Sequence, residues 1–405
     1  MRNLQICSWK PWHLKVRNTL DEQVDALCLD TERNVVLLAS EAAEITAVSA
    51  DCHQVTWQKD MGAGRLKDLA YLLEQEAVCC CCASGEIILI HADSLELEEV
   101  GAVEGGIAAA AWSSDGALLV ILSCHGQLLM LNQDWDILAE VQLEDGVEAP
   151  AAIAWRGDGK HFATLSRQHA GGGTKLRTWS REGMQEVAEG HKADGLLPVL
   201  AWQPNGRHLY TAQRDAHGQR VLLYELNGLQ HGSFNVSGPG TITDMHWSAD
   251  SQLLAIILTT SASSQAQHTS RGASRVQIWH RSNWHWYLKA DKPFKAEACG
   301  VTAKWDEEQP LRLHLCSGIG GYRQVDFAWQ PTVSARGTAA VVDGCRLLLT
   351  PLRLSVIPPP LCSLPASLPA PISHLAFCDH GSCEAVAVLL SDGRLGVFKS
   401  READS

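Results

Sequence analysis

The segment Gly106-Ile-Ala-Ala-Ala-Ala-Trp112-Ser-Ser-Asp-Gly116-Ala-Leu-Leu-Val120 joins an apolar stretch ending in tryptophan, a polar turn and a second apolar stretch. Apolar runs bounded by Ser, Asp and Gly are typical of a β-strand, a tight turn and a returning strand. The unit continues with two more apolar runs that are also bounded by turn residues. It is therefore predicted to be an antiparallel meander with strands at Ile107 to Trp112, Ala117 to Leu122, Gln127 to Asn132 and Ile137 to Leu143.

The same phrase recurs along the chain. Strong copies end at Trp155, Trp202 and Trp247, and weaker copies are anchored at Cys28, Tyr71, Trp305 and Phe377. From Cys28 to Trp247 neighbouring anchors lie 41 to 47 residues apart. A recurrence near 40–45 residues with four strands per unit is typical of a β-propeller. We therefore predict an all-β, WD40-like β-propeller of about seven four-stranded blades.

Composition narrows the class of protein. The chain has 405 residues, 46% of them hydrophobic and 20% charged, which is typical of a folded protein. Its apolar runs have the length of strands, so no membrane association is expected. The first fifteen residues lack the apolar core of a secretory signal, and the fourteen cysteines are scattered through apolar strands, which favours free thiols in a reducing compartment. A net charge of −13 opposes nonspecific binding to nucleic acid.

The domain organisation follows from the repeats and from one proline-dense stretch. We expect residues 1–357 to form the N-terminal propeller and residues 358–371 to be a Pro-rich connection. Residues 372–405 form another strand set, which either closes the ring or begins a second propeller. Whether Met1 to Val16 completes the ring as an outer strand is left open by the sequence.

No motif for catalysis or cofactor binding emerges. Glycine-rich spots match neither the dinucleotide fingerprint nor the P-loop, and no nucleophile, base and orienting group can be assigned. Cys79 and Cys82 have the spacing of metal ligands, but positions i and i+3 of a strand point to opposite faces. We therefore expect buried thiols there, no cofactor, and no enzymatic activity.

Three acidic residues lie three positions before their anchors: Asp25, Asp68 and Asp244. Converging around a propeller channel, they would be candidate metal ligands, because hard cations require several carboxylates. The alternative is that each carboxylate bonds groups of its own blade. We favour the alternative, because the other copies carry Ala109, Ala152, Val199 and Thr302 at this position.

The densest basic and aromatic stretch runs from Arg271 to Lys295. Cations interleaved with aromatic rings suit RNA or an acidic partner. The alternative, which we favour, is that alternate rings pack between blades while the cations are solvated on the outer strand. An exposed aromatic side chain would narrow the difference between the two interpretations. The candidate contact residues are Arg275, Arg281, Trp284, His285, Trp286, Tyr287, Lys289 and Lys292.

Several segments resemble the N-terminal region of the elongator complex protein 1 family, which comprises the largest subunit of Elongator. The resemblance is carried by Met1-Arg-Asn-Leu4, Ala154-Trp-Arg-Gly-Asp-Gly-Lys-His-Phe-Ala163, Tyr224-Glu-Leu-Asn-Gly-Leu-Gln-His-Gly-Ser-Phe234, Asn283-Trp-His-Trp-Tyr-Leu-Lys289 and Val356-Ile-Pro-Pro-Pro-Leu-Cys362. It extends through nearly the whole chain.

The resemblance implies a non-catalytic WD40-like scaffold of Elongator, which supports modification of the wobble uridine (U34) of tRNAs. The implied partners are the radical-SAM and acetyltransferase-like catalytic subunit and the second WD40 subunit, with tRNA contacted only indirectly. Family members dimerise through a C-terminal region that this chain lacks. A cytoplasmic location, with the nucleus as a second one, is expected. The alternatives are a WD40-like adaptor of another intracellular assembly and a propeller with a metal site in its channel.

Overall fold

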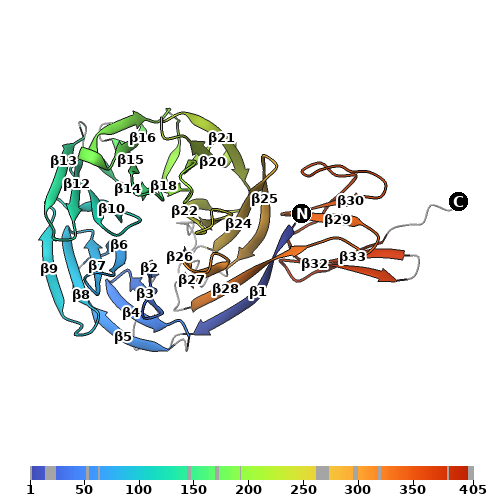
Figure 1. Cartoon of the computed structure of the whole chain (residues 1–405), viewed down its shortest axis with the longest axis horizontal. Coiled ribbons are helices and arrows are strands. Elements are labelled where there is room, and N and C mark those ends of the chain that lie inside the picture. Colours follow the sequence, from blue (N-terminus) through green and yellow to red (C-terminus); the bar gives the residue numbers. More distant parts are fainter. Residues whose placement is uncertain are drawn as a thin grey trace, which may run out of the picture.

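The computed structural model describes residues 2–13, 24–51, 54–62, 64–143, 147–168, 173–191, 193–260, 273–294, 300–317, 321–380 and 383–399. Across these ranges the strands form seven four-stranded sheets and two three-stranded sheets. The seven sheets are the blades of a ring, and the two smaller sheets form a second unit beside it (Figure 1). None of the described residues form a helix of the length and apolarity that a membrane span requires.

The first six blades follow chain order. The first contains β2 (Val24–Asp30), β3 (Val35–Ser40), β4 (Glu44–Ser49) and β5 (Val55–Asp60), and the second contains β6 (Leu66–Leu72), β7 (Ala77–Cys82), β8 (Glu86–His91) and β9 (Leu97–Ala102). The third contains β10 (Ile107–Trp112), β11 (Leu118–Ser123), β12 (Gln127–Asn132) and β13 (Ile137–Gln142). The fourth contains β14 (Val147–Trp155), β15 (His161–Gln168), β16 (Thr174–Ser180) and β17 (Glu186–Glu189), with the short 3₁₀-helix η1 (Glu182–Met184) before its last strand.

The fifth blade contains β18 (Leu196–Trp202), β19 (Leu209–Asp215), β20 (Gly218–Tyr224) and β21 (Gln230–Val236). The sixth contains β22 (Thr241–Trp247), β23 (Leu253–Thr259), β24 (Ser274–Ser282) and β25 (His285–Pro293). The strands predicted for the third blade agree with β10 to β13 to within one residue at each end, so the predicted propeller architecture is confirmed.

The seventh blade joins the two ends of the ring. Its order is β1-β28-β27-β26, with β1 (Arg2–His13) paired antiparallel to β28 (Gly321–Pro331), followed by β27 (Arg312–Ser317) and β26 (Val301–Trp305). The first strands of successive blades contact one another in turn, and β26 contacts β2. The N-terminal strand therefore closes the ring, which answers the question that the sequence left open.

Apolar side chains fill the spaces between blades. Trp179 is buried against residues of the third blade, Tyr224 against the fourth and Trp279 against the fifth. Aromatic side chains near the ends of third strands thus pack between neighbouring blades. Some anchors add a hydrogen bond to this packing, because the Nε1 group of Trp155 donates to the Ala111 carbonyl of the preceding blade at 3.0 Å.

One anchor was assigned wrongly. Leu29 pairs with Val36, just as Tyr71 pairs with Val78 and Trp112 with Leu119, so Leu29 rather than Cys28 occupies the anchor position of the first blade. The ladder slips between Val24 and Ala26, which marks a β-bulge. Because Cys28 lies in a run of four apolar residues, Ala26 to Leu29, hydropathy alone did not show which of them is the anchor.

The second unit contains two sheets. One has β29 (Thr338–Asp343), β30 (Arg346–Pro351) and β31 (Leu364–Ser367), and the other has β32 (Ile372–His380), β33 (Cys383–Leu390) and β34 (Leu395–Lys399). The first sheet spans residue 357, where we placed a boundary, and the stretch 358–371 includes strand β31. Proline is tolerated in β31 because this strand lies at the edge of its sheet, where a missing N–H leaves no ladder bond broken.

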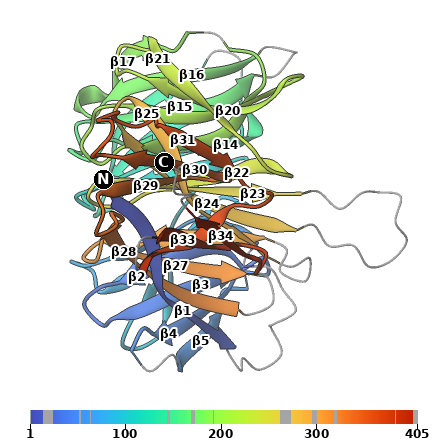
Figure 2. The ribbon, with the colours of Figure 1, turned by 90° about the vertical axis from the view of Figure 1, so that its right-hand side faces the viewer.

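Asn3 connects the ring to the second unit, and the N-terminus lies beside β29 (Figure 2). Its Nδ2 group donates to the Ala340 carbonyl at 2.9 Å and to Thr332 Oγ1 at 2.8 Å. Its Oδ1 atom accepts a 2.9 Å hydrogen bond from the Val342 N–H and one from Lys289 Nζ at 3.4 Å. One buried amide therefore uses its donor and acceptor groups to hold β1, β25 and β29 together.

Lys289 is buried at the same seam, with 4% of its surface exposed. Its Nζ atom also donates to the Val342 carbonyl at 3.0 Å and lies 4.7 Å from the centre of the Tyr287 ring. Burial lowers the pKa of this ammonium group to about 8, although the Asp343 carboxylate opposes the shift. The seam thus contains a lysine that loses its proton more easily than an exposed lysine does.

We predict that Asn3→Ala destabilises the protein by about 2 kcal/mol, because it leaves the buried Val342 N–H and Ala340 carbonyl without their partner. Urea denaturation of purified protein measures this loss. Asn235→Ala, in the exposed part of outer strand β21, is the matched control and should change stability by less than about 0.5 kcal/mol. Equal effects of the two substitutions would contradict the role of Asn3.

We predict that the wild type gains about 2 kcal/mol of stability relative to Lys289→Met between pH 8 and pH 10. In this window the folded chain has lost the Lys289 proton, while the unfolded chain, with its ordinary pKa near 10.5, still holds it. The unfolded state then binds more protons, so the free energy of unfolding rises with pH. The contributions of the other titrating groups cancel in this comparison, because the wild type and the variant share them. A difference in stability that does not change with pH would contradict the prediction.

Candidate functional site

The basic and aromatic stretch forms the hairpin of β24 and β25, and its aromatic side chains divide into two sets. Arg271 and Lys295, at the ends of the predicted stretch, lie outside the described residues. Trp286 and Tyr287 are buried, and Trp286 stacks on Phe234 of the fifth blade with ring centroids 4.3 Å apart. Trp284, by contrast, is 86% exposed. The hairpin therefore packs between blades along its length and presents one aromatic side chain at its tip.

Most of the cations in this hairpin have structural partners. Arg275 Nη1 donates to Asp291 Oδ1 at 2.6 Å, and His285 Nε2 lies 3.2 Å from Asp343 Oδ2. Lys289 belongs to the seam already described, and Lys292 is half-buried. Of the eight candidate contact residues, Arg281 and Trp284 line a large pocket beside the hairpin tip, and Tyr287 and Lys289 line a smaller one of about 140 Å³.

The tip itself is a two-residue turn. Ser282 pairs with His285, and the intervening Asn283 and Trp284 have φ angles of 51° and 61°. Both left-handed residues indicate a type I′ hairpin turn, in which glycine is the usual second residue. A left-handed conformation at a bulky residue costs about 1 kcal/mol or more. The Arg281 guanidinium lies over the Trp284 ring, 5.3 Å from its centre.

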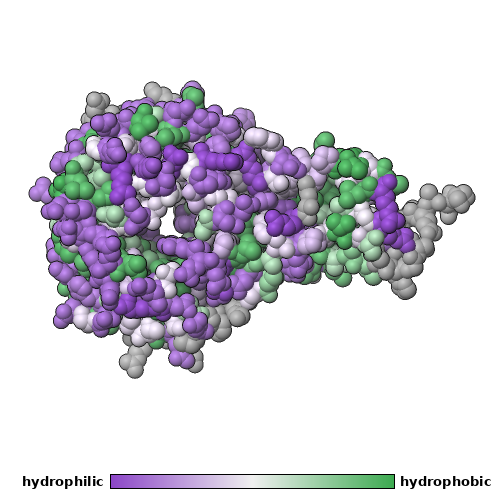
Figure 3. Space-filling model, in the orientation of Figure 1, coloured by the Kyte–Doolittle hydropathy of each residue, from purple (hydrophilic) through white to green (hydrophobic). Residues whose placement is uncertain are grey.

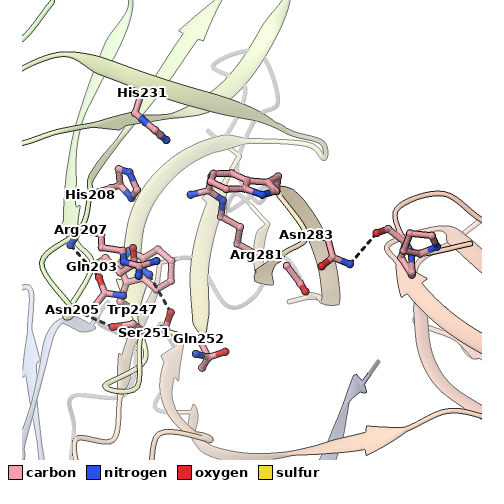
Figure 4. Close-up of a pocket in the computed structure, with 14 residues that line it drawn as sticks. Gln203, Asn205, Arg207, His208, His231, Trp247, Ser251, Gln252, Arg281 and Asn283 are labelled. Carbon is pink, nitrogen blue, oxygen red and sulfur yellow. Dashed lines mark hydrogen bonds between the residues drawn. The ribbon is translucent and has the colours of Figure 1, made fainter.

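Beside this tip lies a pocket of about 780 Å³ between the fifth blade, the sixth blade and the loop that joins β30 to β31. Figure 4 shows Arg281 extending from the β24 side toward His208 and His231. Asn283 Nδ2 donates to the Pro359 carbonyl at 3.0 Å, which attaches the tip to the second unit. The described lining residues are Gln203, Asn205, Arg207, His208, His231, Trp247, Ser251, Gln252, Arg281, Ser282, Asn283, Trp284, Pro358 and Pro359.

The turn between β18 and β19 supplies the basic side of the pocket. Asn205 Oδ1 accepts a 3.0 Å hydrogen bond from the Arg207 N–H, a local bond that favours the turn. The His208 and His231 rings lie 4.6 Å apart. Burial lowers the pKa of His208, and the neighbouring His231, Arg281 and Arg207 lower it further, while Glu225 opposes them. Several basic groups therefore act on one small volume.

The three acidic candidates do not share one site. Arg65 binds the Asp25 carboxylate through Nε at 2.6 Å and Nη2 at 3.2 Å. Asp244 accepts the Met245 N–H at 2.8 Å and lies 2.7 Å from His246 Nε2. Since the first anchor is Leu29, Asp25 lies four residues before its anchor, not three, and so does not occupy the position of Asp68 and Asp244.

Asp68, on β6, has an unusual environment. Burial raises its pKa to about 6, while the Lys304 ammonium group and the Leu69 N–H act in the opposite direction. Among the described residues, no group of three or more His, Cys, Asp or Glu side chains is placed to hold a metal ion. The three carboxylates thus lie in three separate settings.

The four consecutive cysteines lie in β7 and point alternately to its two faces. Cys79 and Cys81 pack toward the third blade, whereas Cys80 and Cys82 pack toward the first. Burial raises the pKa of the Cys80 thiol well above its ordinary value. The prediction that Cys79 and Cys82 lie on opposite faces as buried thiols is confirmed.

The sequence did not single out the fifth-blade side of the pocket. Arg207 and His208 directly follow the turn Pro204-Asn205-Gly206 in the copy anchored at Trp202. Residue type alone did not mark them, because Lys160 and His161 follow the equivalent turn at Gly159 in the same way. What the sequence could not show is that β21, β24 and the loop after β30 approach the same turn.

Two family models match the chain. A model described as "ELP1 first N-terminal beta-propeller" matches residues 1–151 and 144–308. A model described as "ELP1 N-terminal second beta-propeller" matches residues 341–405. The first match covers six complete blades and strands β1 and β26 of the seventh, and the second covers most of the two smaller sheets.

Curated relatives agree with these models. Elongator complex protein 1 of Mus musculus is 31% identical over 96% of this chain and 34% of its own length. The proteins of that name from Arabidopsis thaliana and Schizosaccharomyces pombe are 27% and 25% identical over 98% and 87% of this chain, and 32% and 31% of their own lengths. The chain spans about a third of the length of these relatives. Together the models and the relatives show that this chain belongs to the Elongator complex protein 1 family.

Proposed function

We propose that this chain is a non-catalytic docking subunit of the Elongator complex and supports modification of the wobble uridine (U34) of tRNAs. Membership of the family across the ring and the following sheets is the observation that carries this proposal. The proposed partners are the radical-SAM and acetyltransferase-like catalytic subunit and the second WD40 subunit, and tRNA is contacted only indirectly. The proposed location of this complex is the cytoplasm, with the nucleus as a second location.

The mechanism of such a subunit is positional. Neighbouring blades share apolar cores, so the ring moves as one body and its turns keep fixed distances from one another. The face in Figure 3 is largely hydrophilic, with an opening near the centre of the ring. Partners that bind two separate turns of such a body are held in a fixed relative orientation. Affinity then comes from a few buried side chains at each contact, as in other protein interfaces.

The second unit extends the proposed platform. We assign β29–β31 and β32–β34 to a second propeller, because the second-propeller model matches residues 341–405. Ala340, Leu347, Ile372 and Val388 form a buried core between the two sheets, as neighbouring blades do within the ring. Exposed aliphatic side chains also gather on this unit, at Leu354, Val356 and Leu361 among others (Figure 3).

We predict that the purified chain forms a complex with the recombinant catalytic subunit and the second WD40 subunit at micromolar concentration. Size-exclusion chromatography of the mixture, compared with each protein alone, measures the complex. The chain by itself should leave the wobble uridine of tRNA unmodified, because its proposed role is to position the catalytic subunit. Elution of the chain at its free volume in every mixture would contradict the proposal.

Lysine cross-linking of the same mixture provides an internal control. Lys160 lies exposed in the turn between β14 and β15, whereas Lys289 is buried at the seam. Cross-links from the chain to the other subunits should start from exposed lysines such as Lys160 and never from Lys289. Cross-links from Lys289 would show that the chain had unfolded, and such a preparation would be discarded and the measurement repeated.

A further inference from the structure

The pocket beside Trp284 has the features of a binding site for a small anionic group. Among its described lining residues are Arg207 and Arg281 but no carboxylate. This absence stands out in a chain with a net charge of −13. The two guanidinium groups favour a negatively charged occupant. His208 and His231, both on the fifth blade, contribute less charge, because the His208 pKa is lowered and His231 Nδ1 lies 3.1 Å from Glu225 Oε1.

The tip of the β24–β25 hairpin adds a stacking surface. Trp284 is held almost fully exposed in a left-handed conformation where glycine would relieve the strain. Residues kept in such conformations occur preferentially at binding sites. Because Arg281 covers one face of the ring, the exposed remainder of Trp284 is available to an apolar or planar group.

The size and the chemistry of the walls limit what can bind. A volume of about 780 Å³ lies in the range of pockets that hold a small ligand or a few residues of a peptide. Amide side chains at Gln203, Asn205 and Gln252 line the wall, and amides bind both the N–H and C=O groups of an extended peptide. Arginine forks match the two oxygens of a carboxylate.

We propose that this pocket binds a short acidic peptide segment, whose carboxylates contact Arg207 and Arg281 and whose adjoining side chain packs on Trp284. The segment lies between the fifth and sixth blades, against the loop at Pro358 and Pro359. This site stands on the geometry of the pocket and is independent of the assembly to which the chain belongs.

A peptide fits these observations better than a nucleic acid does. Nucleic acid carries a charge at every nucleotide, so a strand leaving the pocket would cross the surface of a protein with a net charge of −13. A peptide can confine its carboxylates to the two or three residues inside the pocket. Single-stranded RNA is therefore the competing probe in the experiment.

The test uses the whole chain and a fluorescein-labelled octapeptide of alternating Glu and Gly. The matched octapeptide of Gln and Gly and an eight-nucleotide oligouridylate are measured beside it by fluorescence anisotropy. We expect binding of the Glu peptide only, with a loss of about tenfold in affinity for Arg207→Ala and for Arg281→Ala, the size expected for a charge-assisted hydrogen bond. Arg346→Ala, at an exposed position of β30 outside the pocket, is the matched control and should bind as the wild type does.

Trp284→Gly provides a second test, because it should change the melting temperature and the peptide affinity in opposite directions. Glycine should raise the melting temperature by a degree or more, because it relieves the left-handed backbone, and should weaken peptide binding severalfold. A variant that is more stable but binds less supports the site, since damage to the fold would lower both quantities. Equal binding of the Glu and Gln peptides, tighter binding of the oligouridylate, no binding at millimolar peptide, or unchanged affinity in both arginine variants would overturn the proposal. Each of these failures leaves the proposed docking function standing, because co-elution with Elongator subunits is measured separately.

Discussion

The structure depends on the burial of both faces of each blade. Every residue of β7 and of β11 is buried, so neither face of these inner strands is left for solvent, whereas the outer strands β9 and β13 are largely exposed. A four-stranded sheet that is apolar on both sides cannot be stable alone, because both of its apolar faces would be exposed to water. A ring gives each sheet two neighbours and leaves no sheet at an end. The turns, the channel and the exposed outer strands are what remains for other molecules.

Ring closure determines more than the stability of the ring. Strand β1 completes the seventh blade, and the same strand carries Asn3 to the seam with β29. The contact that closes the circle therefore also positions the second unit, whose loop at Pro359 forms one wall of the pocket. Closure, docking of the second unit and formation of the pocket are thus linked through two hydrogen-bonded residues, Asn3 and Asn283.

Local sequence patterns were enough to predict the blades. Contacts between residues far apart in the chain could not be predicted from such patterns. Trp112 pairs with Leu119 because the Ser-Ser-Asp-Gly turn between them reverses the chain within a few residues, and that information is contiguous. The phase around Leu29 was lost because the four apolar residues from Ala26 to Leu29 left no alternation to follow. Asn3 contacts Val342, more than 300 residues away, and no local signal marks such a partner. The exposed aromatic at Trp284 was foreseen as the feature that would favour a contact site, whereas the basic groups across the pocket were not.

The β24–β25 hairpin explains how a strained tip can still serve recognition. Trp279 and Trp286 are buried in the core between the fifth and sixth blades, and Asn283 is bonded to the second unit, so the hairpin is fixed along its length and at its turn. A side chain held in this way loses little conformational freedom when a ligand arrives, and less of the interaction energy is spent on ordering it. The ring supplies the burial that offsets the strain at Trp284. The rigidity that makes the blade a stable part of the ring is therefore the same property that preorganises the exposed tryptophan.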